Sequence, residues 1–136
     1  MKTLVVEDDF ASRKLMHKYL APLGECDVVV DGEEALDAFQ IALNEKAPYD
    51  LICLDIMLPK KDGQEVLKEI RTIEERRGLI GTDATKVIMT TALGDAKNVM
   101  SAFRSQCEGY LQKPISQEQL YQELRELKLL TGGVPR

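Results

Sequence analysis

The feature that most constrains the fold of this chain is a strict alternation of short apolar runs with helical patterns. The runs are continuously apolar and rich in β-branched residues, which indicates strands that are buried on both faces. They cover residues 3–6, 26–30, 51–54, 86–91 and 109–111. Apolar residues recur at helical spacing over 11–20, over 33–43, after Asp62, from Val99 to Phe103, and after Ser116.

This alternation predicts an α/β fold in which a parallel sheet is covered by helices on both faces. Because parallel crossover connections are right-handed, few topologies remain, and a doubly wound five-stranded sheet is the simplest of them. The 136 residues are enough for one domain with a substantial core. We therefore predict a domain over residues 1–130 and a flexible C-terminal tail over 131–136, which is rich in Gly and Pro.

Composition and charge narrow the class of protein. Lys and Arg number 18 against 23 Asp and Glu, so the net charge of −5 argues against direct nucleic acid binding. No apolar run approaches the roughly 20 residues that cross a bilayer, and the N-terminus lacks a signal-peptide pattern. We expect no membrane insertion and a cytoplasmic location. Cys26, Cys53 and Cys107 have no metal-binding spacing and are expected to be buried free thiols.

Polar side chains follow the predicted strands, where open α/β sheets bind their ligands. Three acids follow the first strand, one follows the third, a hydroxyl ends the fourth, and a lysine follows the fifth: Glu7, Asp8, Asp9, Asp55, Thr91 and Lys113. Clustered carboxylates raise one another's pKa unless a cation neutralises them. Oxygen ligands at an open rim suit Mg²⁺, which keeps several of its waters.

Next to a metal, Asp55 has one oxygen available to the ion and another for attack on phosphorus. Lys113 and the Thr91 hydroxyl would then balance the charge of the phosphoryl oxygens. Each residue also has a plainer explanation when taken alone, such as a helix cap for Asp8 or Asp9. Their convergence on one rim favours a phosphoryl-acceptor site.

These residues match a known family. The sequence resembles the receiver domain of two-component response regulators, including single-domain chemotaxis regulators, over about residues 2–130. The matching motifs are Leu-Val-Val-Glu-Asp-Asp at 4–9, Asp-Ile-Met-Leu-Pro at 55–59 with Asp-Gly at 62–63, Thr-Ala at 91–92, and Gly-Tyr-Leu-Gln-Lys-Pro-Ile at 109–115. The resemblance implies a flavodoxin-like fold with strand order 2-1-3-4-5.

The resemblance also implies roles for individual residues. Asp55 would be the phosphoryl acceptor, with Thr91 as the switch hydroxyl, Tyr110 as the switch aromatic residue, and Lys113 before a peptide bond to Pro114 that is usually cis. Mg²⁺ would be held by Asp8 and Asp55 through their side chains and by Met57 through its backbone carbonyl, with Glu7 completing the acidic pair.

The implied function is a signalling switch rather than an enzyme with a separate substrate. The chain would take a phosphoryl group from a histidine kinase or phosphotransfer protein and change its surface for a downstream protein. The family also allows a phosphorylation-dependent dimer. A receiver-fold interaction module that works without phosphorylation is the alternative. A haloacid-dehalogenase-type phosphatase is disfavoured because Met57 stands where that class of enzyme requires a second acid. A flavin-binding module is disfavoured because the three acids at residues 7–9 would repel the phosphate of the flavin.

One segment departs from the family pattern. The connection over residues 76–86, between the third helix and the fourth strand, is several residues longer than usual. We expect the extra length to change the local surface and to leave the acidic rim intact.

Overall fold

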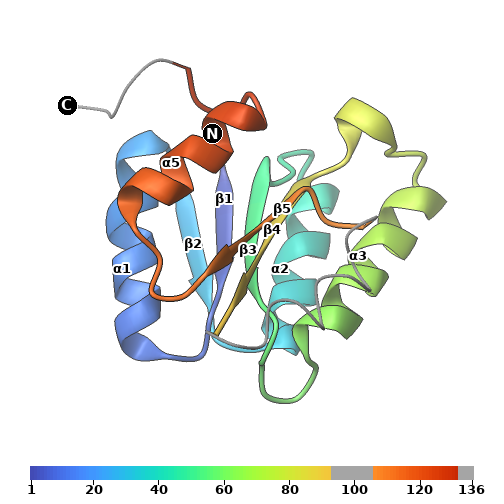
Figure 1. Ribbon diagram of the computed structural model, residues 1–136. Coiled ribbons are helices and arrows are strands. Elements are labelled where there is room, and N and C mark those ends of the chain that lie inside the picture. Colours follow the sequence, from blue (N-terminus) through green and yellow to red (C-terminus); the bar gives the residue numbers. More distant parts are fainter. Residues whose placement is uncertain (93–105, 132–136) are drawn as a thin grey trace.

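Five parallel strands form the centre of the structure, a computed structural model that describes residues 1–92 and 106–131 (Figure 1). The strands lie in the order β2-β1-β3-β4-β5, which confirms the predicted doubly wound, flavodoxin-like sheet. Their bounds are Thr3–Val6 for β1, Cys26–Val29 for β2, Leu51–Asp55 for β3, Lys86–Thr91 for β4 and Gly109–Gln112 for β5.

Helices cover both faces of the sheet. In Figure 1, α1 and α5 lie on one face, and α2 and α3 lie on the other. Their bounds are Phe10–Leu20 for α1, Gly32–Asn44 for α2, Gly63–Arg76 for α3 and Gln117–Glu126 for α5, and a 3₁₀ turn at Ala21–Leu23 follows α1. The helix predicted from Val99 to Phe103 lies outside the described residues, as does the predicted tail after Thr131.

A side-chain cap begins each of these four helices. Asp9, Asp31, Asp62 and Ser116 each accept a hydrogen bond from the backbone N–H three residues further on. Such caps satisfy N–H groups that have no partner within the helix. The sequence predicted helices after Asp62 and Ser116, and these two residues are the caps of α3 and α5. It placed the start of α2 one residue late, because Asp31 is the cap and Gly32 is already helical.

Alternate strand residues face two separate cores. Leu4 and Val6 pack toward α2 and α3, whereas Val5 packs toward α1 and α5. The central strands β3 and β4 are covered on both faces in the same way, as their continuous apolar runs predicted. The prediction of a buried thiol is wrong for Cys26, which is half-buried. Cys26 lies in the edge strand β2, which is less covered than the central strands. Cys107 is also half-buried because it precedes β5 in a surface connection, while Cys53 in β3 is buried.

Within residues 1–92 and 106–131, no helix has both the length and the apolar character that crossing a membrane requires.

The long connection after α3 is fixed to the sheet by Arg71. It contains a 3₁₀ turn at Gly81–Asp83. The Arg71 guanidinium donates to the backbone carbonyls of Gln106 and Thr85, each at 2.8 Å, and to the carboxylates of Glu74 at 2.7 Å and Glu108 at 2.9 Å. Glu74 is 2% exposed, and it also accepts the Thr85 N–H at 2.7 Å. This network, centred on the buried Glu74 carboxylate, ties α3 to the starts of β4 and β5.

Removing the Arg71 side chain should destabilise the protein strongly. In Arg71→Ala, the buried Glu74 carboxylate loses its counter-charge, and breaking such a buried pair costs about 3 kcal/mol. We expect a loss of that size in the free energy of unfolding measured with urea. Arg76→Ala, an exposed position on the same helix, should change it by less than about 0.5 kcal/mol. Equal effects of the two substitutions would contradict a structural role for the network.

Candidate functional site

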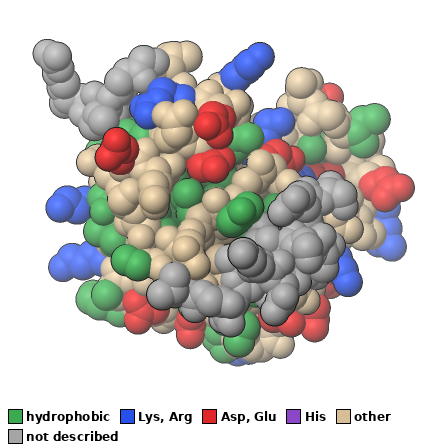
Figure 2. All heavy atoms as spheres, in the orientation of Figure 1, with side chains coloured by type: hydrophobic (Ala, Val, Ile, Leu, Met, Phe, Trp, Pro, Cys, Tyr) green, Lys and Arg blue, Asp and Glu red, His purple; other side chains and the backbone are tan. Residues whose placement is uncertain are grey.

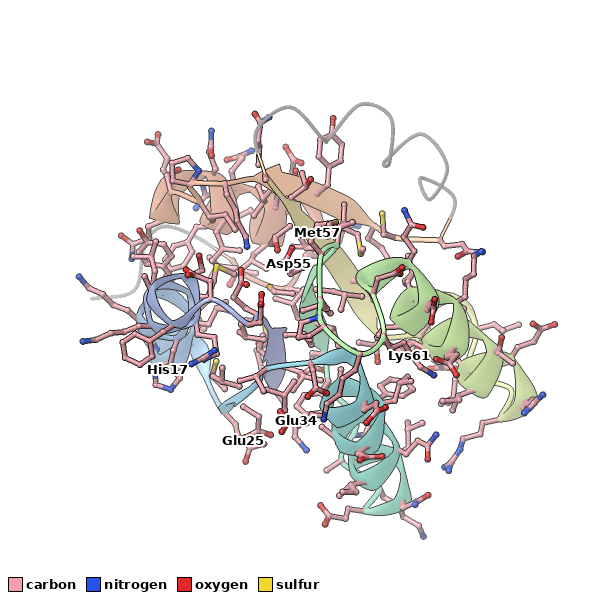
Figure 3. The ribbon with its side chains drawn as sticks, turned by 90° about the horizontal axis from the view of Figure 1, so that it is seen from below. His17, Glu25, Glu34, Asp55, Met57 and Lys61 are labelled. Atoms are coloured by element: carbon pink, nitrogen blue, oxygen red, sulfur yellow. The ribbon has the colours of Figure 1, made fainter. Side chains whose placement is uncertain are left out.

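Three carboxylates meet at the carboxyl edge of the sheet, which Figure 3 views directly. Glu7 and Asp8 follow β1, and Asp55 is the last residue of the adjacent strand β3. One oxygen from each carboxylate lies within 4.8 Å of the other two. Glu7 and Asp55 are buried and Asp8 is exposed, so the group opens to solvent on one side. This donor set fits a hard divalent cation such as Mg²⁺.

The third acid of the turn has a different task. Asp9 caps α1, and its side chain accepts the Ser12 N–H at 2.9 Å. This hydrogen bond lowers the pKa of Asp9. Asp8 does not cap the helix, and it lies with Glu7 and Asp55. Of the two acids that the sequence offered as helix caps, Asp9 is therefore the one used.

Arg13 holds the backbone of the acidic turn, a contact that the sequence did not reveal. Its Nη1 donates to the carbonyl oxygens of Glu7 at 3.2 Å and Asp8 at 2.9 Å. An arginine in the first turn of a helix gives no hint of such acceptors, because it is more often solvated. The contact fixes the direction of the chain between β1 and α1.

The Lys113 ammonium is shared by two of the carboxylates. It donates to Asp55 Oδ2 at 2.9 Å and to Glu7 Oε1. The sequence predicted Lys113 at this rim, and it did not predict the direct pairing with Glu7. Burial acts to lower the pKa of Lys113, but its hydrogen bonds to Glu7 and Asp55 outweigh burial and raise it. The peptide bond from Lys113 to Pro114 is cis, as the resemblance implied.

Glu7 is almost completely buried, which is unusual for a carboxylate. A cavity of about 140 Å³ adjoins it, lined mainly by apolar side chains that include Val5, Leu15, Met16 and Ile115. Burial, reinforced by hydrogen bonding to Asp55, raises the pKa of Glu7 to about 7, and the hydrogen bond from Lys113 opposes this shift. The charge of Glu7 therefore depends on its cationic partners.

The loop after β3 begins with a contact to Asp55 itself. The Met57 N–H donates to Asp55 Oδ1 at 3.1 Å, so each Asp55 oxygen has a donor. Gly63 then starts α3 directly behind Asp55, and a Cβ atom there would lie 2.2 Å from the Asp55 carbonyl oxygen. Only glycine permits this approach. The predicted role of the Met57 carbonyl as a metal ligand stays a prediction.

The two predicted switch residues lie on neighbouring strands. Thr91 is buried at the end of β4, and its carbonyl accepts the Lys113 N–H at 2.7 Å. Tyr110 in β5 is 45% exposed and pairs with Met89, two residues before Thr91. Because side chains alternate along strands, Thr91 and Tyr110 share the sheet face that carries α2 and α3. Their switching roles stay predictions.

Comparison with known proteins identifies the family. The family model of the response regulator receiver domain matches residues 3–125. This chain belongs to that family. As a receiver domain it is a component of two-component signalling systems.

Proteins similar to this receiver domain include longer transcriptional regulators and receiver domains of known structure. The transcriptional regulatory protein ResD of Bacillus subtilis is 35% identical over 127 residues, which are 93% of this chain and 47% of that protein. The chain spans about half the length of the curated relatives it matches. Among solved structures, a mutant receiver domain of the Arabidopsis thaliana histidine kinase CKI1 has a TM-score of 0.79 at 26% identity, covering 93% of this chain and 89% of that one. Vibrio cholerae chemotaxis protein CheY4 has a TM-score of 0.74 at 26% identity, covering 92% and 96%.

The dependence of Glu7 on Lys113 is directly measurable. In the parent protein without added metal, the Glu7 carboxyl group should titrate near pH 7. Because the Lys113 ammonium lowers this pKa, the Lys113→Met variant should titrate at a higher pH. ¹³C NMR of glutamate carboxyl groups across a pH series measures both midpoints. A parent midpoint near 4.5 would show that the carboxyl group is solvated.

Proposed function

We propose that this receiver domain accepts a phosphoryl group on Asp55 from a histidine kinase or a phosphotransfer protein. The observation that most directly supports this proposal is the position of Asp55 at the end of β3. Its carboxylate lies within 4.8 Å of Glu7 and Asp8 and accepts a hydrogen bond from Lys113. We further propose that Glu7, Asp8, Asp55 and the Met57 carbonyl hold Mg²⁺, which when bound supplies positive charge to the carboxylates and phosphoryl oxygens.

Each residue of this chain has a defined part in the proposed transfer. A carboxylate oxygen of Asp55 attacks the phosphorus, and the bond from phosphorus to the donor nitrogen or oxygen breaks, leaving an acyl phosphate on Asp55. The Met57 N–H at Asp55 Oδ1 orients the carboxylate before attack. The Lys113 ammonium compensates the charge on the phosphoryl oxygens. Thr91, buried at the adjacent strand end, contributes its hydroxyl to one of them.

The product stays on the chain, so the proposed outcome is a signal. We propose that phosphorylation changes the surface that a downstream protein recognises, in the cytoplasm, and that a second phosphorylated copy is one such partner. On the face shown in Figure 2, Lys and Arg side chains are interspersed with Asp and Glu, and the net charge is −5. A mixed surface of this kind favours a protein partner over a nucleic acid backbone.

Phosphorylation should depend on Asp55 alone. Incubation of the parent protein with Mg²⁺ and acetyl phosphate should add one phosphoryl group, detected as a mass increase of the intact protein. Asp55→Asn should remove the label, because an amide cannot form an acyl phosphate. Asp9→Asn is the matched control, since asparagine also caps helices, and it should be labelled like the parent. Lack of labelling in the parent would favour the alternative of an interaction module that works without phosphorylation.

Transmission of the signal should depend on Thr91. A distant surface responds only if the phosphoryl group favours one of two arrangements of some element. We propose that the Thr91 hydroxyl moves toward the phosphoryl group and that Tyr110, on the same sheet face, fills the space behind it.

Thr91→Ala should therefore still accept a phosphoryl group at Asp55 and fail to transmit it. The measurement compares NMR shifts in the parent and in Thr91→Ala, each with and without beryllofluoride. In the parent, changes should spread from Asp55 to Tyr110 and Leu120. In the variant they should stay near Asp55. Identical changes at Tyr110 in both proteins would exclude Thr91 as the link.

A further inference from the structure

The loop from β3 to α3, residues 56–62, packs against the first residue of α2. Gly32 is buried there, and a Cβ atom on it would lie 2.1 Å from the Lys61 carbonyl oxygen, 2.8 Å from Lys61 Cβ and 2.8 Å from Val66 Cγ2. The first two atoms belong to Lys61 in the loop, one to its backbone and one to the base of its side chain. The third belongs to the short, branched side chain of Val66, so none of the three is the far end of a flexible side chain. The contact therefore requires glycine at position 32 for reasons of space.

A second contact joins the same two elements. Lys60 adopts a left-handed backbone conformation with φ of 66°, and its Nζ lies 3.5 Å from Asp31 Oδ2. Asp31 is 4% exposed and caps α2 by accepting the Glu34 N–H at 2.9 Å. Figure 3 shows the loop running from Asp55 and Met57 to Lys61 beside the end of α2 that carries Glu34. The start of α2 thus meets the loop at two points: the packing at Gly32 fixes the position of the loop, and the ion pair of the exposed Lys60 adds little to it.

The other end of this loop touches the acceptor. Met57 donates its N–H to Asp55 Oδ1 at 3.1 Å. Between Met57 and the contact at Gly32 the loop makes a tight turn, in which the Lys61 N–H donates to the Pro59 carbonyl at 2.7 Å. A short loop that is fixed at both ends cannot absorb a displacement at Lys61 without moving Met57. The support at α2 is therefore a support for the acceptor geometry.

We propose that the Asp31–Gly32 step at the start of α2 positions the β3–α3 loop and, through it, Met57 and the Asp55 carboxylate. Gly32 and Asp31 touch neither metal nor phosphoryl group in this proposal, so they are positioning residues. The inference rests on the proposed function, because it assigns the loop a place in the Mg²⁺ and phosphoryl site. It adds α2 to the elements on which that site depends.

Gly32→Ala tests the steric part of this proposal, with Ala38→Gly as the matched control. Ala38 is a half-buried residue within α2, and glycine there weakens the helix without touching the loop. In Gly32→Ala, the ¹³C-methyl signal of Met57 should shift while that of Met16, in the opposite core, stays in place. Mg²⁺ affinity measured by calorimetry should fall about tenfold, as is typical when residues supporting a metal ligand are changed. Ala38→Gly should lower the urea midpoint and leave Mg²⁺ affinity unchanged.

Substitutions at Lys60 provide a test that does not depend on the folding of Gly32→Ala. Lys60 is exposed, so its variants should fold. Valine strongly disfavours a left-handed backbone, whereas glycine adopts it readily. Lys60→Val should therefore displace the loop and weaken Mg²⁺ binding. Lys60→Gly keeps the left-handed backbone and loses only an ion pair whose lysine is exposed, so it should bind Mg²⁺ within about twofold of the parent.

The outcomes separate this inference from the proposed function. If the parent binds Mg²⁺ and takes up the phosphoryl label while Gly32→Ala and Lys60→Val behave like it, the positioning role is overturned and the proposed function stands. An equal loss of Mg²⁺ affinity in Ala38→Gly also overturns it, because general weakening of α2 would then suffice. If the parent itself neither binds Mg²⁺ nor takes up the label, the proposed function fails and this inference fails with it.

Discussion

The sharing of the Lys113 ammonium between Glu7 and Asp55 is the interaction on which the rest of the site depends. The two carboxylates are buried at the ends of adjacent strands, where like charges repel and a solvent shell is lacking. Lys113 comes from the loop after β5 and reaches across the edge of the sheet to both of them. Strand order makes this possible, because parallel strands deliver all their carboxyl ends to one rim. A single ammonium group thus links the first, third and fifth strands.

The carboxyl edge of the sheet, where the strands end, and the opposite edge, where the strands begin, are stabilised by different interactions. At the carboxyl edge, lysine is a compact charge on a flexible stem, which lets one ammonium group reach two carboxylates. At the opposite edge, Arg71 uses a planar fork whose hydrogen bonds to Gln106, Thr85, Glu74 and Glu108 all have fixed directions. At the carboxyl edge one flexible side chain serves two carboxylates, and at the opposite edge one planar group fixes four acceptors in place.

The sequence predicted those features that depend on local pattern or strand position. Apolar runs placed the strand ends within one residue of the observed ones, and the resemblance supplied the strand order. Glu7, Asp8 and Asp55 were predicted to meet because they follow strands that end at the same edge. Contacts between distant backbone and side-chain atoms were beyond prediction. The acceptors of Arg71 include carbonyl groups 14 and 35 residues away, and the constraint at Gly32 comes from the Lys61 carbonyl, which no spacing rule connects to it.

The long segment after α3 has a consequence for protein engineering. Its base is fixed by the hydrogen bond from Arg71 to the Thr85 carbonyl and by the hydrogen bond from the Thr85 N–H to the Glu74 carboxylate. At its tip, a Cβ built on Gly78 or Gly81 would have no described atom within 4 Å apart from those of the glycine and its chain neighbours. Ile80 between them is 71% exposed. Length added at the tip would extend into solvent, at the edge of the sheet opposite Asp55. Because Leu79 packs against the core, Ile80 and Gly81 are the natural insertion point for a fluorescent or affinity module in a receiver-based biosensor.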